Sequence, residues 1–178
     1  MSTEKKQDSS AKLVLVLFAI SVVTALLLGL VNMVTAPAIA ANEEKTRNEA
    51  MAEVLPADSY EQVEYTGGDP LVTAVYQAGD AGYVVQVAPS GFGGNLDIMV
   101  GVGADGTCTG VSIISHAETS GLGANATKED FRAQFVGKAN VAVTKDGGDI
   151  AALTGATITS RAVCDGVNAA IEAAASVG

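Results

Sequence analysis

Tryptophan is absent from this 178-residue chain, aromatic residues make up 4% of it, and histidine occurs once. Basic residues are also few: Lys and Arg number 10 against 20 Asp and Glu, which makes the formal net charge -10. Because binding to a nucleic acid backbone depends on clustered Lys and Arg, this balance argues against a nucleic-acid-binding protein. The length predicts one modest domain with an appendage rather than two independent domains.

Cysteine is also scarce, since the chain has two, Cys108 and Cys164, far apart in sequence. Neither belongs to a CxxC or Cys/His pattern, and the single histidine has no second one beside it, so the sequence predicts no metal site. We expect both thiols to be small buried apolar groups. A disulfide between them stays an open alternative, because sequence does not show whether the two come together.

One long hydrophobic run lies near the N-terminus, with no charged residue between Leu13 and Ala41. Residues 13–36 exceed the roughly 20 apolar residues that cross a bilayer. They predict a transmembrane helix in contact with membrane lipid, after a short tail over residues 1–12. A cleaved signal peptide is the alternative, but the run is longer than the roughly 7–15 residues of a signal-peptide core.

Basic residues on the two sides of this run indicate its orientation. Three lysines lie within residues 1–12, whereas Lys45 and Arg47 follow the run. The positive-inside rule therefore favours a single-pass cell-membrane protein with a cytoplasmic N-terminus. We expect the rest of the chain, residues 37–178, to be extracytoplasmic.

The segment after the run reads as a connecting helix or stalk over residues 37–60. Good helix formers follow Pro37, and Pro56 ends the helical pattern. Two runs rich in β-forming residues, 71–78 and 82–89, are separated by a Gly-Asp-Ala-Gly turn and predict a hairpin.

The clearest hairpin lies in residues 95–116, where apolar residues alternate on both sides of an Asp-Gly turn. The alternating residues are Leu96, Ile98, Val100, Val102, Val111 and Ile113. A helix is expected over 127–137, with Thr127 and Asp130 as a capping box. A further strand is expected over 140–144.

The last helical pattern begins at about Ser160. Its apolar stripe consists of Val163, Val167, Ala170, Ile171 and Ala174. Antiparallel hairpins with interspersed helices indicate an α+β domain rather than a doubly wound one. The predicted architecture is a single N-terminal transmembrane helix followed by a domain over 61–178, with an antiparallel sheet and packed helices.

Four hydroxyl side chains surround one glycine just before this last helix, in the stretch "LTGATITSRAV". Thr159 or Ser160 would satisfy free N–H groups at the start of the helix, which is a common use of such residues. A helix N-terminus beside a tight turn at Gly155 also suits a phosphate group. Spacing alone favours capping.

A second polar stretch, "SHAETSGLG" at residues 115–123, contains the single histidine and a carboxylate. Its two glycines, Gly121 and Gly123, would let the backbone approach a flat ligand, with Leu122 as an apolar face. An ordinary solvated loop is the alternative.

Together these stretches resemble the FMN-binding domain family, most closely the G-subunit family of Rnf-type ion-translocating ferredoxin:NAD oxidoreductases. The family's flavinylation motif, Ser/Thr-Gly-Ala-Thr followed by x-Thr-Ser, stands here as "TGATITS". Its H-x-E-T-P-G-L-G companion stands as "HAETSGLG", and "GFGGNLDIMVGV" resembles the Gly-rich strand entry. Two positions depart from the pattern: Ala151 replaces a frequent aspartate, with Asp149 nearby, and Ser120 replaces the proline.

The resemblance implies that FMN is joined to the Thr157 hydroxyl by a phosphoester bond, made by a separate flavin transferase of the ApbE type. The residues that would shape the phosphate pocket are Thr154, Gly155, Ala156, Thr159 and Ser160. Those that would lie against the isoalloxazine and ribityl parts are Glu118, Thr119, Gly121, Leu122 and Gly123. His116 would orient their loop.

The resemblance also implies an electron-transfer subunit with no catalysis of its own. Its partners would be a second flavin-bearing membrane subunit and iron–sulfur subunits of a complex that couples ferredoxin:NAD oxidoreduction to ion translocation. The C subunit of the Na+-translocating NADH:quinone oxidoreductase is an alternative, although the shorter chain and "HAETSGLG" favour the Rnf type. From another class, the chain would be a membrane-tethered, non-redox binding or scaffold module whose hydroxyls cap a helix.

Overall fold

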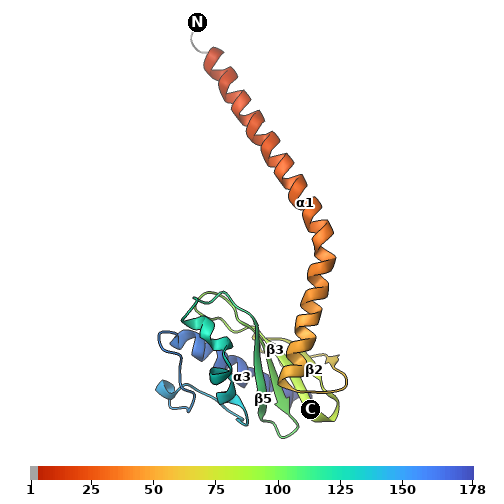
Figure 1. Ribbon diagram of the computed structural model, residues 1–178, viewed down its shortest axis with the longest axis vertical. Helices are drawn as coiled ribbons and strands as arrows, with labels where there is room; N and C mark the ends of the chain where they lie inside the picture. The colour runs from red at the N-terminus through yellow and green to blue at the C-terminus, as the bar shows by residue number, and fades with distance from the viewer. Residues whose placement is uncertain (1–3) are drawn as a thin grey trace. The chain divides into compact units, whose positions relative to one another are not determined.

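The computed structural model describes residues 4–178, with side chains from residue 11 onward (Figure 1). The chain separates into two compact units, Met1–Lys45 and Thr46–Gly178. Its helices and strands are α1 (Glu4–Val54), β1 (Glu61–Val63), β2 (Val72–Gln77), β3 (Gly82–Val87), β4 (Asp97–Gly103), β5 (Cys108–Ser115), α2 (Glu129–Arg132) and α3 (Thr157–Val177). Short 3-10 turns are η1 (Gly79–Ala81), η2 (Gly123–Thr127), η3 (Ala133–Phe135) and η4 (Thr144–Asp146).

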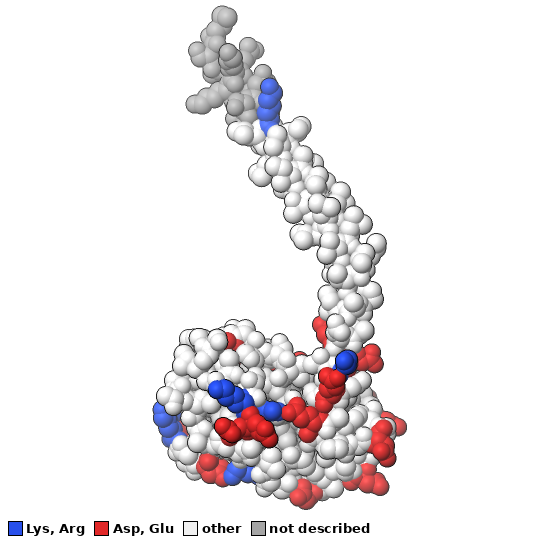
Figure 2. Space-filling model, viewed as in Figure 1, with Lys and Arg blue, Asp and Glu red and all other residues white. Residues whose placement is uncertain are grey.

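The described part of the first unit is the N-terminal portion of α1. Leu, Val and Ala dominate its sequence, and its large apolar side chains are exposed. In the space-filling view this portion shows uncharged side chains between its two ends (Figure 2). From Ala11 onward, α1 is long and apolar enough to cross a membrane. The predicted apolar helix is confirmed, and it has the length to serve as a membrane anchor.

No helix break occurs within residues 4–54 at the expected junction between span and stalk. Pro37 lies inside α1, which continues to Val54. Thr24 and Thr35 each donate a hydrogen bond to the carbonyl four residues earlier, at 2.8 and 2.9 Å. Both hydroxyls are thereby satisfied within the helix, as an apolar surrounding requires.

The second unit is built on an antiparallel sheet of five strands in the order β1-β2-β3-β4-β5. Both predicted hairpins are present, since β2 pairs with β3 across η1 and β4 pairs with β5. The three-residue strand β1, which pairs with β2 at the sheet edge, was not predicted. The predicted α+β class is confirmed.

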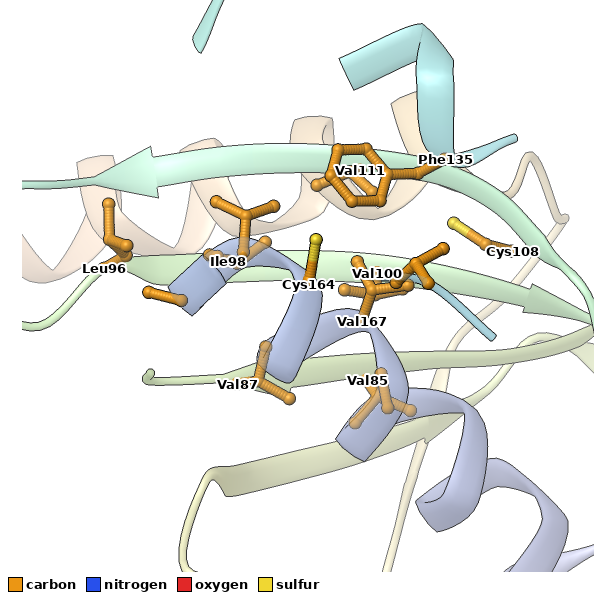
Figure 3. Packing of buried hydrophobic residues seen from close by; sticks show 14 of the residues in the cluster. Val85, Val87, Leu96, Ile98, Val100, Cys108, Val111, Phe135, Cys164 and Val167 are labelled. Atoms are coloured by element: carbon orange, nitrogen blue, oxygen red, sulfur yellow. The ribbon is translucent and has the colours of Figure 1, made fainter. Parts of the chain in front are cut away.

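Helix α3 covers one face of this sheet and forms the main core with it (Figure 1). Val85 of β3 and Ile98 and Val100 of β4 lie on the side of the sheet that carries Val167 of α3 (Figure 3). All four side chains are fully buried. The alternation predicted for β4 therefore marks the face that packs against α3.

Two cysteines and two phenylalanines complete this core. The rings of Phe131 and Phe135 meet edge to face, with centroids 5.4 Å apart. Cys108 and Cys164 are buried free thiols in the described part of the chain. Burial raises their pKa values to about 11 and about 12, so both are protonated packing groups at neutral pH.

The last turns of α1 cover the opposite face of the sheet. There Met51 and Val54 pack in one buried cluster with Tyr76, Val84 and Met99. The compact unit therefore begins at residue 46, within the segment expected as a connecting helix.

Two glycines allow α1 to approach the sheet closely. Gly101 of β4 pairs with Gly110 of β5, and a Cβ at either position would press into the backbone of Val54. The Thr109 hydroxyl donates to the Val54 carbonyl at 2.6 Å. This bond satisfies one of the carbonyls that a helix leaves free at its C-terminal end.

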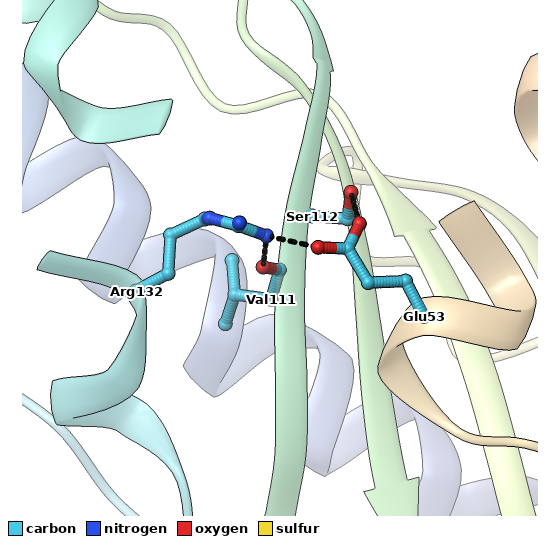
Figure 4. Close-up of polar contacts among 4 residues, drawn as sticks. All are labelled: Glu53, Val111, Ser112 and Arg132. Atoms are coloured by element: carbon cyan, nitrogen blue, oxygen red, sulfur yellow. Dashed lines mark hydrogen bonds and ion pairs between the residues drawn. The ribbon is translucent and has the colours of Figure 1, made fainter. Parts of the chain in front are cut away.

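Glu53, also at the end of α1, forms hydrogen bonds with residues of α2 and β5 (Figure 4). Its Oε1 accepts a hydrogen bond from Arg132 Nη1 at 2.8 Å, and its Oε2 accepts one from the Ser112 hydroxyl at 2.6 Å. Arg132 Nη1 also donates to the Val111 carbonyl at 2.9 Å. Burial raises the pKa of Glu53, but the hydrogen bonds from Ser112 and Arg132 outweigh burial and lower it below 4.5. The carboxylate is therefore ionised at neutral pH.

Replacing Arg132 with glutamine should destabilise the domain by about 1 kcal/mol, because Glu53 loses its cation and the Val111 carbonyl loses a donor. The control is Lys128→Gln, which removes a positive charge at an exposed position just before α2 and should leave stability unchanged. Urea unfolding followed by circular dichroism measures both variants. Equal midpoints for the wild type and Arg132→Gln would contradict the expectation.

The helix predicted over 127–137 is not a single helix. Parts of η2, α2 and η3 divide the segment. The Thr127 hydroxyl donates to the Ala124 carbonyl at 2.9 Å instead of accepting a hydrogen bond from α2. The predicted capping box of Thr127 and Asp130 is therefore wrong.

The strand predicted over 140–144 is also wrong. Val143 forms an isolated bridge with Ile150 rather than a ladder. The N–H of Val141 donates to Asn168 Oδ1 of α3, and Asn168 Nδ2 donates to the Val141 carbonyl, both at 2.9 Å. An asparagine side chain thus satisfies the backbone groups that a neighbouring strand would otherwise satisfy.

Candidate functional site

A cavity of about 380 Å³ lies among three segments of the second unit. They are the Gly-rich loop between β3 and β4, the loop after β5, and the first turn of α3 with the turn before it. The lining residues are Phe92, Glu118, Thr119, Leu122, Gly123, Gly155, Ala156, Thr157, Ile158 and Thr159. A cavity of this volume lies in the range of small-molecule sites.

The segment that leads into α3 is held by its neighbours. Gln134 accepts a hydrogen bond from the Ala151 N–H at 2.8 Å and donates to the Ala151 carbonyl at 3.4 Å. Arg161 of α3 donates twice to Asp146, at 2.6 and 2.7 Å. Gly155 then turns the chain with a φ of 75°, a conformation that favours glycine.

Two of the motif hydroxyls are buried and committed to hydrogen bonds. Ser160 Oγ accepts from the Leu153 N–H and donates to the Ala156 carbonyl, both at 2.9 Å. The Thr159 hydroxyl donates to Glu118 Oε2 at 2.7 Å. The N-cap residue of α3 is Ala156, and within residues 11–178 no side chain caps this end. The capping explanation for Thr159 and Ser160 is therefore wrong.

Thr157 has different surroundings. It is the first residue of α3, which begins three residues before the expected start at Ser160. Its side chain lines the cavity, and its hydroxyl has no hydrogen-bond partner among the side chains and backbone described. The first N–H groups of a helix lack intrahelical partners. A free hydroxyl thus lies beside helix N-terminal donors, which attract phosphate.

Glu118 connects all three segments. Its Oε1 accepts hydrogen bonds from the N–H groups of Phe92 and Gly93, at 2.8 and 3.0 Å. Its Oε2 accepts the hydroxyl of Thr159. His116 Nδ1 accepts a hydrogen bond from the N–H of Glu118 at 3.2 Å, which orders this loop.

Three exposed apolar side chains line the same cavity. Phe92 is 71% exposed, Ile158 51% and Leu122 43%. Single exposed apolar residues are ordinary, but three around one cavity provide an apolar surface for a ligand.

Of the twelve residues expected from the motifs, eight line the cavity: Glu118, Thr119, Leu122, Gly123, Gly155, Ala156, Thr157 and Thr159. His116 and Ser160 are not part of the lining, but each forms a hydrogen bond with a lining residue. Thr154 and Gly121 are exposed and outside it.

Sequence reasoning missed Phe92 and Ile158, which also line the cavity. A phenylalanine flanked by glycines was an available signal for the first. Ile158 occupies the variable position of the motif and offered no signal.

Glu118 is ionised at neutral pH. Burial raises its pKa, but the hydrogen bonds from Thr159, Gly93 and Phe92 outweigh burial and lower it below 4.5. Because the folded-state pKa lies below that of the unfolded chain, this carboxylate stabilises the fold above about pH 4.5. The stabilisation is lost as the pH falls through the folded-state pKa.

We therefore expect the wild type to be more stable than Glu118→Gln at about pH 7, with the difference shrinking as the pH falls below about 4.5. Urea unfolding midpoints at several pH values would measure this. A difference that stays constant over the whole range would contradict the expected ionisation.

Comparison with known proteins adds an independent line of evidence. Residues 1–54 match the RnfG N-terminal region, and residues 91–172 match the FMN-binding domain. The G subunit of the proton-translocating ferredoxin:NAD(+) oxidoreductase complex of Clostridium ljungdahlii is 35% identical, with 97% of this chain and 95% of the relative covered.

Two further relatives give the same result. The G subunit of the Na(+)-translocating ferredoxin:NAD(+) oxidoreductase complex of Acetobacterium woodii is 37% identical, with 97% of each chain covered. The G subunit of the ion-translocating oxidoreductase complex of Methanosarcina acetivorans is 36% identical, with 90% of this chain and 92% of the relative covered. The similarity thus spans both the apolar helix and the domain with the cavity, and the chain belongs to the family of G subunits of ion-translocating ferredoxin:NAD oxidoreductase complexes.

Proposed function

We propose that this subunit is a membrane-anchored electron carrier in which FMN is joined to the hydroxyl of Thr157 by a phosphoester bond. The proposal rests on a difference in burial and hydrogen bonding among the hydroxyl groups of the motif. Thr159 and Ser160 are buried and hydrogen-bonded, whereas Thr157 lines the cavity with no partner for its hydroxyl among the described residues. An acceptor hydroxyl must be free to form the new bond.

The residues around the cavity suit FMN in charge and in shape. The N-terminus of α3 offers N–H donors and a partial positive charge to a phosphate. Phe92, Leu122 and Ile158 offer apolar surface to a flat ring system, and Thr119 adds a hydroxyl to the same lining. The positive φ of Gly155 shapes the turn beside Thr157.

Attachment would need a separate flavin transferase of the ApbE type. The Thr157 oxygen would form a bond to the phosphorus of the FMN moiety of FAD, the pyrophosphate P–O bond would break, and AMP would leave. Within residues 11–178 no group accepts a hydrogen bond from this hydroxyl, so the base that takes its proton belongs to the transferase. Thr157 is an acceptor and not a catalytic residue.

Bound FMN supplies reversible uptake and release of electrons, while the chain holds it and tunes its surroundings. Electrons pass between neighbouring redox subunits of the complex, which include a second flavin-bearing membrane subunit and iron–sulfur subunits. Ion movement belongs to other membrane subunits, because one span provides no ion pathway. The lysines of residues 1–12 favour a cytoplasmic N-terminus and an extracytoplasmic FMN domain.

The alternative as C subunit of the Na+-translocating NADH:quinone oxidoreductase shares the anchor and the motif. The match of residues 1–54 to the RnfG N-terminal region, and the full-length similarity to G subunits, favour the Rnf-type complex.

Denaturing the protein after purification from its native membrane tests the proposal. Flavin fluorescence should migrate with the chain in a denaturing gel, and the intact mass should exceed that of the sequence by one FMN phosphoester. A native protein with neither fluorescence nor added mass would overturn the proposal in favour of a non-redox scaffold. Flavin released on denaturation would overturn the covalent linkage alone.

A further inference from the structure

The Glu118 carboxylate occupies a socket built from segments that are far apart in sequence. Besides its three hydrogen-bond donors, two glycines border it closely. A Cβ on Gly91 would collide with Oε1, and a Cβ on Gly123 would collide with Oε2 and come within 2.8 Å of Thr159 Oγ1. The glycines on both sides therefore leave room for this carboxylate.

At the tip of the Gly-rich loop between β3 and β4, Gly93 lies against the Ala117 backbone, but among the described residues only Glu118 hydrogen-bonds residues 91–94 to another segment. The loop's glycines carry no side chains that would pack, and Phe92 is exposed. Within the loop, the Gly91 N–H donates to the Gly94 carbonyl at 2.8 Å, and Ser90 Oγ donates to Asn95 Oδ1 at 3.0 Å. These bonds close the loop on itself but do not join it to α3.

We infer that Glu118 is a positioning residue for the flavin site, whose carboxylate joins the Gly-rich loop to the first turn of α3 and so holds Phe92 and Thr157 in a fixed relation. The inference rests on the proposed function. It adds Glu118 as a residue that acts on the site through its hydrogen bonds to Phe92, Gly93 and Thr159. Phe92 is held through its own N–H, and Thr157 through Thr159 two residues later.

Direct action of Glu118 on the cofactor does not fit its surroundings. Its oxygens face protein donors, and an ionised carboxylate accepts hydrogen bonds but does not donate them. Glu118 is therefore no proton donor to the cofactor, and its hydrogen bonds are to Phe92, Gly93 and Thr159 rather than to the hydroxyl of Thr157.

A pair of substitutions separates the hydrogen bonds from the charge. Glu118→Ala removes all three bonds. Glu118→Gln can keep all three bonds. Its amide oxygen accepts from the N–H groups of Phe92 and Gly93, and its NH2 group donates to the hydroxyl of Thr159. In the wild type the Thr159 hydroxyl is the donor, so the direction of this one bond is reversed. The control is Glu172→Ala, at an exposed position of α3.

The first readout is amide hydrogen exchange at Phe92 and Gly93, measured in the full chain carrying Thr157→Val so that no attached flavin is involved. We expect about tenfold faster exchange in Glu118→Ala, since each lost bond is to a charged group. Glu118→Gln should restore most of the protection. Exchange in Glu118→Ala at the control rate would overturn the inference.

The second readout uses the flavinylated full chain with Thr157 intact. In Glu118→Ala the attached flavin should show lower fluorescence anisotropy and a shifted midpoint potential, and Glu118→Gln should restore both. A Glu118→Gln protein as altered as Glu118→Ala would overturn the inference, because the charge itself would then be required.

A third variant covers the case in which Glu118→Ala fails to fold. Thr159→Val is nearly isosteric and removes one donor from the socket, so it should lower the anisotropy while exchange at Phe92 and Gly93 changes less. Unchanged anisotropy in this variant would count against the link to α3. Absence of flavin from the wild type would refute the proposed function, yet the exchange experiment would still be informative.

Discussion

Thr157→Val should abolish covalent flavin attachment completely. Valine keeps the shape of threonine but has no oxygen to bond to phosphorus, and the neighbouring Thr159 and Ser160 hydroxyls are buried and hydrogen-bonded. Intact mass and in-gel flavin fluorescence, measured after expression with the flavin transferase, report the result. Unlabelled protein with a normal unfolding midpoint is the expected outcome.

Two further variants test whether the effect is specific. Thr157→Ser keeps the hydroxyl and should retain attachment, whereas Thr66→Val makes the same substitution at an exposed position outside the cavity and should stay fully labelled. Flavin that persists in Thr157→Val would place the linkage on another oxygen. Thr119, which also lines the cavity, would then be the next residue to replace.

Phe135→Ala should cause the largest loss of stability, about 3–5 kcal/mol. The side chain is fully buried beneath the sheet and contacts Phe131 edge to face, so truncation leaves a cavity in the main core. The matched control is the neighbouring Val136→Ala, whose side chain is 53% exposed and which should change stability by less than about 0.5 kcal/mol.

Thermal unfolding followed by circular dichroism measures this pair. A loss of that size corresponds to a fall of roughly 10–20 °C in Tm for a domain of this length. Similar midpoints for Phe135→Ala and Val136→Ala would mean that the segment after α2 is not part of the cooperative core.

The sheet was predictable because its two hairpins combine period-two apolar residues with clear turns. The long stripe of α3 was equally clear. Strand β1 was not, since its three residues, Glu61–Val63, form an edge strand in a polar stretch. The segment around Val141 and Val143 has the composition of a strand but is bonded to the side chain of Asn168, and no local pattern reveals such a distant partner.

The site was predictable to the extent that it follows short motifs. The motif residues identify the loops around the cavity, but they do not reveal the hydrogen-bond partner of each hydroxyl. Thr159 is bonded to Glu118, which lies 41 residues earlier, and Ser160 is bonded to the backbone before the helix. Hydroxyl residues next to the start of a helix suggested capping. In the structure the hydroxyl of Thr159 donates to Glu118 instead, and that of Ser160 donates to the Ala156 carbonyl. The exposed ring of Phe92 joins the cavity because its loop folds back onto Glu118.

The packing of Met51 and Val54 against the sheet has a practical consequence for handling the protein. A fragment that starts at Pro56, where the sequence pattern of the helix ends, would lose the turns that cover Val84 and Met99 and would be prone to aggregate. A fragment that starts at Thr46 keeps those turns. Electrochemistry on that longer fragment would report the flavin in a native fold, free of detergent.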